Sequence, residues 1–258
     1  MPSLELTVAL LSDQAGLPEV APIDDTAIDG VLAAGAVELL GRMPWSSNAT
    51  FIARVGDGDG QVLAIYKPQR GERPLWDFPE GTLCLREVAA AEISERLGWD
   101  LVPRTVLRDD LPHGLGSLQR FVDHDPEDHY FTMLEAHADE FRRFAVFDIV
   151  VNNTDRKGGH LLRAATGEII GIDHGVCFHP QWKLRTVIWE FGGDEIAEPL
   201  LADLERLVDT LTAGDPIIET LLSPIEIAAV RGRAEHLLEA RRYPLPGDDH
   251  RHYPWPLV

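Results

Sequence analysis

The chain has 258 residues, of which 45% are hydrophobic, and its formal net charge at pH 7 is −20. This length is sufficient for one large domain or two smaller lobes, each with its own core. The acidic balance argues against the broad basic surfaces that bind nucleic acids or anionic membranes. We therefore expect no nucleic acid partner and no stable membrane association.

The pattern of cysteines and apolar residues indicates a reduced, cytoplasmic protein. Cys84 and Cys177 are the only cysteines and lack CxxC spacing, and no run of 18 apolar residues is present. The N-terminal stretch lacks the basic start and the cleavage site of a signal peptide. Only three of the 23 basic residues are lysines, namely Lys67, Lys157 and Lys183. Because lysine and arginine do different chemistry, the position of each lysine is informative.

The first half of the chain predicts a small sheet with two helices. A capped helix is expected over residues 24–34 and a strongly periodic helix over 83–97. Strands are expected over residues 36–43, 51–55, 61–68, 101–107 and 116–122. The turn at 44–50 separates two of these strands, and a loop is expected over 69–82.

The second half of the chain predicts mainly helices. Residues 123–134 are acidic and rich in turn formers, which is typical of a linker. Helices are expected over residues 136–151, 199–211, 216–222 and 224–242, followed by an irregular tail. We therefore predict two domains, an N-lobe over 1–122 and a C-lobe over 123–258.

The stretch 147–178 carries the strongest indication of chemistry. Two short apolar runs, 161–162 and 169–172, are joined by a turn and predict a hairpin. Asp155 and His160 lie at its entrance and Asp173 at its exit, so the fold of a hairpin brings them together. Two carboxylates and an imidazole beside a glycine-containing loop suit metal-assisted phosphoryl transfer.

Further candidates lie upstream in the predicted sheet. The turn containing Ser46, Ser47 and Asn48 offers hydroxyl and backbone N–H groups to an anion. One hairpin later, a strand ends in Lys67. Glu87 and Glu92 in the following helix are candidate partners for this lysine.

Together these motifs resemble the phosphatidylinositol 3- and 4-kinases, in particular the type II phosphatidylinositol 4-kinases and their short bacterial relatives. The resemblance covers residues 36–190. It rests on SSNATF at 46–51, YKP at 66–68, Glu87 in REVAAAE, LVPRT at 101–105, GSLQRFV at 116–122, NTDR at 153–156 and IDHG at 172–175.

The resemblance implies an α+β, bilobal, protein-kinase-like fold with a small antiparallel β-rich N-lobe and a mainly helical C-lobe. It also implies ATP with Mg²⁺ or Mn²⁺ as the cofactor. Lys67, oriented by Glu87, would contact the α- and β-phosphates. The other ATP-binding residues would be Ser46, Ser47 and Asn48 at the phosphates, and Gln119, Arg120, Phe121 and Val122 at adenine through main-chain groups.

In the second half, the resemblance makes Asp155 the residue that orients or deprotonates the acceptor. Arg156 would buttress the loop or stabilise charge on the transferred group, and Asp173 would hold the metal. His160 stands where the lipid kinases have a metal-binding asparagine, and imidazole suits softer transition metals better than Mg²⁺. This change predicts a Mn²⁺ preference, weak catalysis or its loss, unless His160 only caps the hairpin.

Three functions follow from these residues. The first is an ATP-dependent kinase whose acceptor is a hydroxyl of a soluble protein, of the kinase itself or of a small molecule. The second is a pseudokinase that binds nucleotide or a partner without turnover. The third is a metal-dependent hydrolase using His160, Asp173, His174 and His179, although these histidines lack HExxH or HxHxD spacing. The resemblance places acceptor choice in the loop 174–190.

Overall fold

The computed structural model describes residues 20, 23–43, 46, 48–58, 60–247 and 251–258. The chain divides into two compact units. Unit 1 contains residues 1–88 and 103–122, and unit 2 contains residues 89–102 and 123–258. Helix α3 (Leu83–Leu97) contributes to both units, so this division differs from a single cut after residue 122. The assignment of functional lobes to 1–122 and 123–258 stays a prediction.

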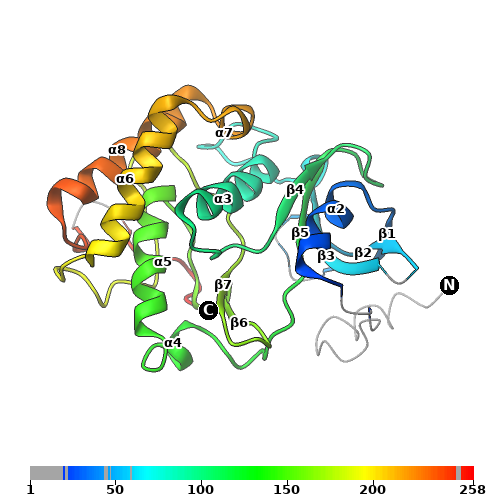
Figure 1. The fold of residues 1–258 in the computed structure, drawn as a ribbon, viewed down its shortest axis with the longest axis horizontal. Helices are drawn as coiled ribbons and strands as arrows, with labels where there is room; N and C mark the ends of the chain where they lie inside the picture. The colour runs from blue at the N-terminus through cyan, green and yellow to red at the C-terminus, as the bar shows by residue number, and fades with distance from the viewer. Residues whose placement is uncertain (1–19, 21–22, 44–45, 47, 59, 248–250) are drawn as a thin grey trace. The chain divides into compact units, whose positions relative to one another are not determined.

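Unit 1 is built on a five-stranded sheet in which every neighbouring pair is antiparallel (Figure 1). The strand order is β1-β2-β3-β5-β4. The strands are β1 (Val37–Arg42), β2 (Phe51–Asp57), β3 (Gly60–Pro68), β4 (Thr105–Arg108) and β5 (Gly116–Arg120). Strand β5 pairs with β3 on one side and β4 on the other, and this pairing sets Lys67 opposite Ser117.

The core of unit 1 lies between this sheet and helix α2 (Asp25–Ala34). The carboxylate of Asp24 accepts the backbone N–H of Thr26 and caps the helix. Ile28 and Leu32 then bury their side chains, because their spacing puts both on the face toward the sheet. Their neighbours in the core are Val55, Val62, Ala64, Tyr66, Leu111 and Leu118.

Unit 2 is mainly helical. Its elements are α4 (Tyr130–Met133), α5 (Ala138–Val151), the 3₁₀ turn η2 (Gly158–His160), β6 (Leu161–Arg163), β7 (Ile169–Gly171), α6 (Glu198–Ala213), α7 (Pro216–Leu221) and α8 (Pro224–Ala240). Helix α8 packs against α6 and α5 (Figure 1). Ser223, Pro224 and Glu226 begin α8 with a capping box and a proline in the first turn, as the sequence predicts. The predicted α+β class, with an antiparallel sheet first and helices after it, is confirmed.

Three local predictions were wrong. Strand β4 begins at Thr105 rather than at residue 101, since Pro103 has no N–H to donate to a ladder. Leu101 has a different role, because its carbonyl accepts the N–H of Gly171 in the hairpin of unit 2. The supposed linker 123–134 contains the short helix α4, whose Tyr130 and Met133 are buried. Strand β5 also ends at Arg120, two residues before the predicted end.

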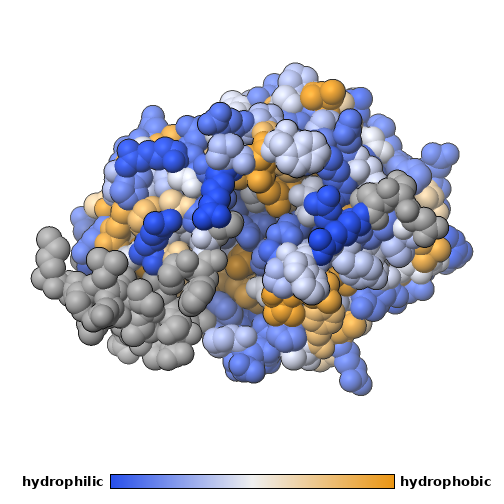
Figure 2. Space-filling view, turned by 180° about the vertical axis from the view of Figure 1, so that it is seen from behind, coloured by the Kyte–Doolittle hydropathy of each residue, from blue (hydrophilic) through white to orange (hydrophobic). Residues whose placement is uncertain are grey.

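Large apolar side chains also reach the surface. Trp76 is 92% exposed and Trp255 is 74% exposed. On the face drawn in Figure 2, apolar residues lie among hydrophilic ones. No helix in the described part of the chain combines the length and apolar character needed to cross a bilayer.

Candidate active site

In unit 1 the structure brings Lys67 and Glu87 together in an ion pair. Lys67 stands at the end of β3, and Glu87 lies in the part of α3 that belongs to unit 1. The Glu87 side chain is only 3% exposed. A carboxylate this deeply buried is costly without a cationic partner, so the pair fixes the direction of the lysine.

The predicted phosphate loop is tied to the segment that follows β3. Asn48 accepts the backbone N–H of Arg73 through its side-chain oxygen at 2.9 Å, and the Ala49 N–H donates to the Gly71 carbonyl at 3.0 Å. The Ser46 hydroxyl lies 2.7 Å from that of Thr50. The third predicted phosphate ligand, Ser47, lies outside the described residues. The described part of the turn is therefore held by hydrogen bonds to the segment 71–73 and by the contact between Ser46 and Thr50.

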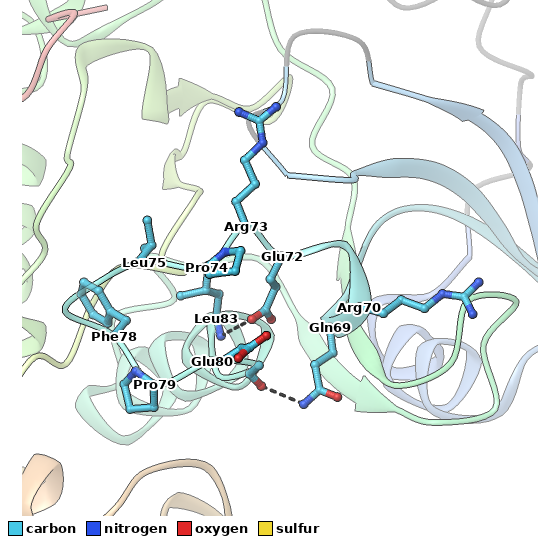
Figure 3. Close-up of a pocket in the computed structure, with 11 residues that line it drawn as sticks. Gln69, Arg70, Glu72, Arg73, Pro74, Leu75, Phe78, Pro79, Glu80 and Leu83 are labelled. Atoms are coloured by element: carbon cyan, nitrogen blue, oxygen red, sulfur yellow. Dashed lines mark hydrogen bonds between the residues drawn. The ribbon is translucent and has the colours of Figure 1, made fainter.

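Unit 1 also contains a cavity of about 310 Å³ beside this turn (Figure 3). The 3₁₀ turn η1 (Gln69–Gly71), the loop after it and the start of α3 line the cavity. The Glu72 carboxylate accepts the N–H groups of Leu83 and Cys84 and so caps α3 from a distance. The Gln69 side chain donates to the Gly81 carbonyl at 2.8 Å. These bonds explain how a long loop without regular structure keeps a defined path.

The predicted adenine segment has part of its backbone already engaged. The N–H of Arg120 donates to Arg104 at 2.8 Å, and the N–H of Phe121 donates to Leu63 at 2.9 Å. The Gln119 side chain is buried and donates to the Thr105 hydroxyl at 2.9 Å. Main-chain contact of this segment with adenine would therefore use groups other than these two N–H groups.

In unit 2 the candidate catalytic loop begins where α5 ends. Asn152 has φ of 52°, a left-handed conformation that asparagine tolerates better than most residues. Its side-chain amide donates to the carbonyls of His179 and Gln181, both at 2.7 Å. The same side chain accepts the N–H of Lys183 at 3.0 Å. One residue thus ends the helix and joins it to the loop 178–183.

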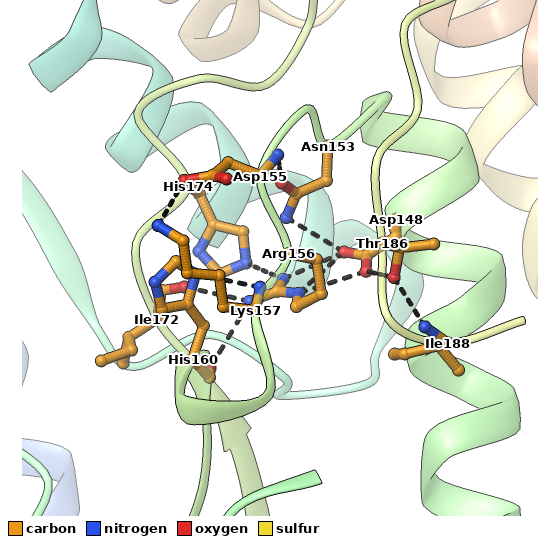
Figure 4. Close-up of polar contacts among 10 residues, drawn as sticks. All are labelled: Asp148, Asn153, Asp155, Arg156, Lys157, His160, Ile172, His174, Thr186 and Ile188. Atoms are coloured by element: carbon orange, nitrogen blue, oxygen red, sulfur yellow. Dashed lines mark hydrogen bonds and ion pairs between the residues drawn. The ribbon is translucent and has the colours of Figure 1, made fainter. Parts of the chain in front are cut away.

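Beneath this loop lies a fully buried ion pair between Asp148 of α5 and Arg156 (Figure 4). Arg156 donates to both carboxylate oxygens at 3.0–3.1 Å. Its guanidinium also contacts the Ile172 carbonyl at 3.0 Å and the His174 ring at 2.6 Å. The Thr186 hydroxyl donates to the same Asp148 carboxylate at 3.1 Å. Two roles were predicted for Arg156, buttressing of the loop and stabilisation of charge on the transferred group. Its side chain has no exposed surface, so its geometry suits the first of these.

Asp155 lies next to this arginine but points to the surface. Its side chain is 36% exposed and its carboxylate accepts from the Lys157 ammonium group at 2.7 Å. The Asn153 side chain accepts the Asp155 N–H at 3.0 Å and donates to Asp148 at 3.2 Å. Burial raises the pKa of Asp155 above its ordinary value, and the charge of Asp173 adds to this effect while Lys157 opposes it. The ionised form of Asp155 is therefore favoured by the neighbouring Lys157 cation.

Asp173 follows β7 in a left-handed conformation with φ of 61°, which turns the chain at that point. Its carboxylate is 54% exposed and lies 3.5 Å from the Nε2 atom of His160. The other ring nitrogen, Nδ1, lies 3.4 Å from the N–H of Lys157. The structure thus brings the two predicted metal-binding residues together. It also gives His160 the hairpin-capping contact that was the alternative.

The donor set fits a divalent cation that phosphate oxygens also bind. Asp155 and Asp173 repel one another electrostatically, and a cation would relieve this repulsion. Among the described residues, no group of three or more His, Cys, Asp or Glu side chains is arranged as a metal cage. Mg²⁺ and Mn²⁺ sites of kinases need no such cage, because phosphates and water complete them. The four residues of the hydrolase hypothesis are not assembled, since His174 is buried against Arg156.

Two members of the site were missed from the sequence. Asp148 has a signal in hindsight, because it is a charge within the apolar run Phe147–Val151 at the end of a helix. Thr186 has no signal of this kind. It reaches Asp148 only through the path of the loop 178–189.

The antiparallel sheet followed by helices, the Lys67–Glu87 pair of unit 1 and the neighbouring carboxylates Asp155 and Asp173 of unit 2 agree with the kinase-like architecture that the sequence motifs predict. A family model described as phosphatidylinositol 3- and 4-kinase matches residues 95–216. Protein Rv2133c of Mycobacterium tuberculosis is 41% identical over 264 residues, which cover 88% of this chain and 94% of that protein. The chain therefore belongs to the phosphatidylinositol 3- and 4-kinase family, which confirms the resemblance seen in the sequence.

More distant relatives include two proteins of Arabidopsis thaliana. Phosphatidylinositol 4-kinase gamma 4 is 27% identical over 53% of this chain, and phosphatidylinositol 4-kinase gamma 1 is 25% identical over 57%. The matches span only 28% and 33% of those plant proteins. Among solved structures, the Helicobacter pylori proinflammatory kinase CtkA matches with a TM-score of 0.49 and 14% identity, covering 81% of this chain and 93% of that one.

Removing the Asp148 carboxylate is expected to destabilise the protein strongly. In an Asp148→Ala variant, Arg156 becomes a buried charge without its counter-ion, which typically costs about 3–5 kcal/mol. The matched control is Glu198→Ala, which removes the partner of Arg241 from an exposed ion pair and should cost about 0–1 kcal/mol. Urea denaturation of both variants measures the difference. Equal midpoints would contradict the view that the buried pair stabilises unit 2.

The raised pKa of Asp155 predicts a stability change of the opposite sign. A carboxyl whose pKa is higher in the folded than in the unfolded state destabilises the fold when ionised. Asp155→Asn should therefore raise the melting temperature at neutral pH. The gain should shrink as the pH falls toward the ordinary Asp pKa of 3.8. Thermal melts over this pH range measure the effect, with Asp209→Asn at an exposed position as the control. A lower melting temperature of Asp155→Asn at neutral pH would contradict the view that ionised Asp155 destabilises the fold.

Proposed function

We propose that this chain is an ATP-dependent kinase that transfers the γ-phosphate to a hydroxyl of a soluble protein, of itself or of a small molecule. The observation that carries the proposal is the Asp155 carboxylate, held beside Lys157 and close enough to Asp173 to feel its charge. Membership of the phosphatidylinositol 3- and 4-kinase family supports the reaction class. The acceptor is left open among these three kinds.

In unit 1, Lys67 would contact the α- and β-phosphates of ATP, with Glu87 holding the ammonium group in place. The turn with Ser46, Ser47 and Asn48 would contribute N–H groups and hydroxyls. Gln119 to Val122 would meet adenine. These assignments follow the family pattern, and the buried Lys67–Glu87 pair supports the first of them.

In unit 2, Asp155 would accept the proton of the acceptor hydroxyl as the oxygen attacks the γ-phosphate. Lys157 would have two roles in this step. Its charge keeps Asp155 ionised, and it lies where it can stabilise negative charge on the transferred group. Arg156 acts through Asp148 and the loop backbone, so we treat it as a positioning residue.

Asp173 would hold a divalent cation, with His160 as a second ligand. Such a cation would neutralise phosphate charge during transfer. For Nε2 of His160 to bind a metal, the proton of the neutral imidazole must reside on Nδ1. The contact of Nδ1 with the Lys157 N–H would then be lost. This competition links metal binding to the conformation of the loop that carries Asp155.

The direct test is transfer from γ-labelled ATP with Mg²⁺ or Mn²⁺, scored as labelled protein and as released phosphate. Asp155→Asn should lower the rate about 10²–10⁴-fold, because the base is lost while the shape is kept. Glu87→Gln should weaken ATP binding. Glu38→Gln, which changes an exposed ion pair on the sheet of unit 1, should not. Nucleotide binding by the wild type with no more turnover than Asp155→Asn under both metals would instead establish the pseudokinase.

The identity of residue 160 should set the metal preference. His160→Asn replaces imidazole by an oxygen donor, so it should shift support of transfer from Mn²⁺ toward Mg²⁺. Binding of Mn²⁺ with ATP, followed by electron paramagnetic resonance, gives a readout that does not need turnover. An unchanged Mn²⁺ spectrum and an unchanged metal ratio in His160→Asn would show that His160 only caps the hairpin.

A further inference from the structure

Residues 251–258 follow an irregular path, yet they contact two functional loops of unit 2. The C-terminus of the chain lies beside the β6–β7 hairpin (Figure 1). Most side chains of the segment gain little from burial, since Trp255, Leu257 and Val258 are exposed while His252 and Pro254 are buried. Two of its backbone carbonyls accept hydrogen bonds from other parts of unit 2.

The first anchor is the carbonyl of His252. It accepts the backbone N–H of Thr186 and the indole N–H of Trp189, both at 3.1 Å. The two rings of Trp189 and His252 also meet edge to face, with centroids 5.7 Å apart. This anchor holds part of the loop 174–190, in which the resemblance places acceptor choice.

The second anchor is the carbonyl of Leu257, which accepts the N–H of Gly158 at 2.7 Å. Gly158 is three residues after Asp155. A Cβ atom on Gly158 would lie 3.3 Å from the Leu257 oxygen and 3.1 Å from the Phe131 ring, so the absence of a side chain permits this close approach. At Gly159 the nearest atom would be a Val258 methyl at 3.6 Å, an ordinary contact.

Both anchors are connected to the same buried pair. Thr186, whose N–H meets His252, donates its hydroxyl to Asp148. Asp148 binds Arg156, and Gly158 follows two residues later. The segment therefore closes a ring of contacts around the loop that carries Asp155.

We propose that residues 251–258 form a strap that positions the catalytic loop for phosphoryl transfer, with the carbonyls of His252 and Leu257 as the positioning groups. The proposal rests on the proposed kinase function. A blocking role fits the geometry less well, because Asp155 and Asp173 keep 36% and 54% of their side-chain surfaces exposed with the strap in place. The strap thus holds the backbone of the loop and leaves its carboxylates accessible.

A matched pair of glycine variants tests this role. Gly158→Ala pushes against the Leu257 carbonyl, whereas Gly159→Ala should be tolerated. We expect Gly158→Ala to lower kcat about tenfold or more through misplacement of the loop, with an unchanged KM for ATP because Lys67 and Glu87 lie in unit 1. Gly159→Ala should retain wild-type values. Equal kinetics of the two variants, or a higher kcat in Gly158→Ala, would overturn the proposal.

A second experiment is independent of turnover and of Phe131. In a chain lacking residues 255–258, amide hydrogen exchange at Gly158 should accelerate at least about tenfold, since its hydrogen-bond acceptor is gone. The amide of Lys183, which donates to Asn152, serves as the internal reference and should not change. Unchanged protection of Gly158 would refute the strap even if the protein is an active kinase. If the shortened chain loses protection at Gly158 but the full chain shows no transferase activity, the contact in the full chain is supported and only the proposed function is rejected.

Discussion

The buried Asp148–Arg156 pair is the interaction on which the candidate catalytic region depends. Both side chains are fully enclosed, and the guanidinium contacts with Ile172 and His174 tie the segment after β7 to helix α5. A buried ion pair is weak evidence for net stability, because desolvation offsets most of the attraction. Its value here is geometric, since a planar, multidentate group fixes direction as well as distance. The loop can therefore be irregular and still be well defined.

Two aspartates near this buried pair have different environments. Asp148 and Asp155 lie seven residues apart, yet one is a structural anion paired with a permanent cation and the other is a half-buried carboxylate paired with a lysine. Lysine is the rarer choice in a chain dominated by arginine. The lysine ammonium group could exchange a carboxylate partner for a phosphate, because it makes no planar, bidentate contact of the kind an arginine makes. A lysine at position 157 is thus consistent with the role proposed for Asp155 and Lys157.

Much of this arrangement was readable from the chain, and the reasons are local. Turn residues, caps and apolar periodicity predicted β2, β3, α3, α5 and α8 close to their observed bounds, and the hairpin argument brought His160 and Asp173 together. The partner of Arg156 was not predictable from spacing, because Asp148 lies in the preceding helix and only packing decides which way it faces. Helix α4 was missed because one buried turn amid acidic residues leaves no periodic signal. The contacts of residues 251–258 were invisible for another reason, since backbone carbonyls are common to every residue.

That last feature has a consequence for how such proteins diverge. An anchor made by a carbonyl oxygen places little demand on the side chain of its own residue, so the exposed positions 255–258 are free to drift in sequence while the path of the chain is retained. The constraint is displaced onto the receiving side, where the residue at 158 must stay small. Alanine substitutions at residues 255–258 would change little, whereas a change to the backbone path of these residues would change much. Relatives that share the contact would then be recognised by a small residue three positions after the aspartate that corresponds to Asp155, rather than by any motif at their ends.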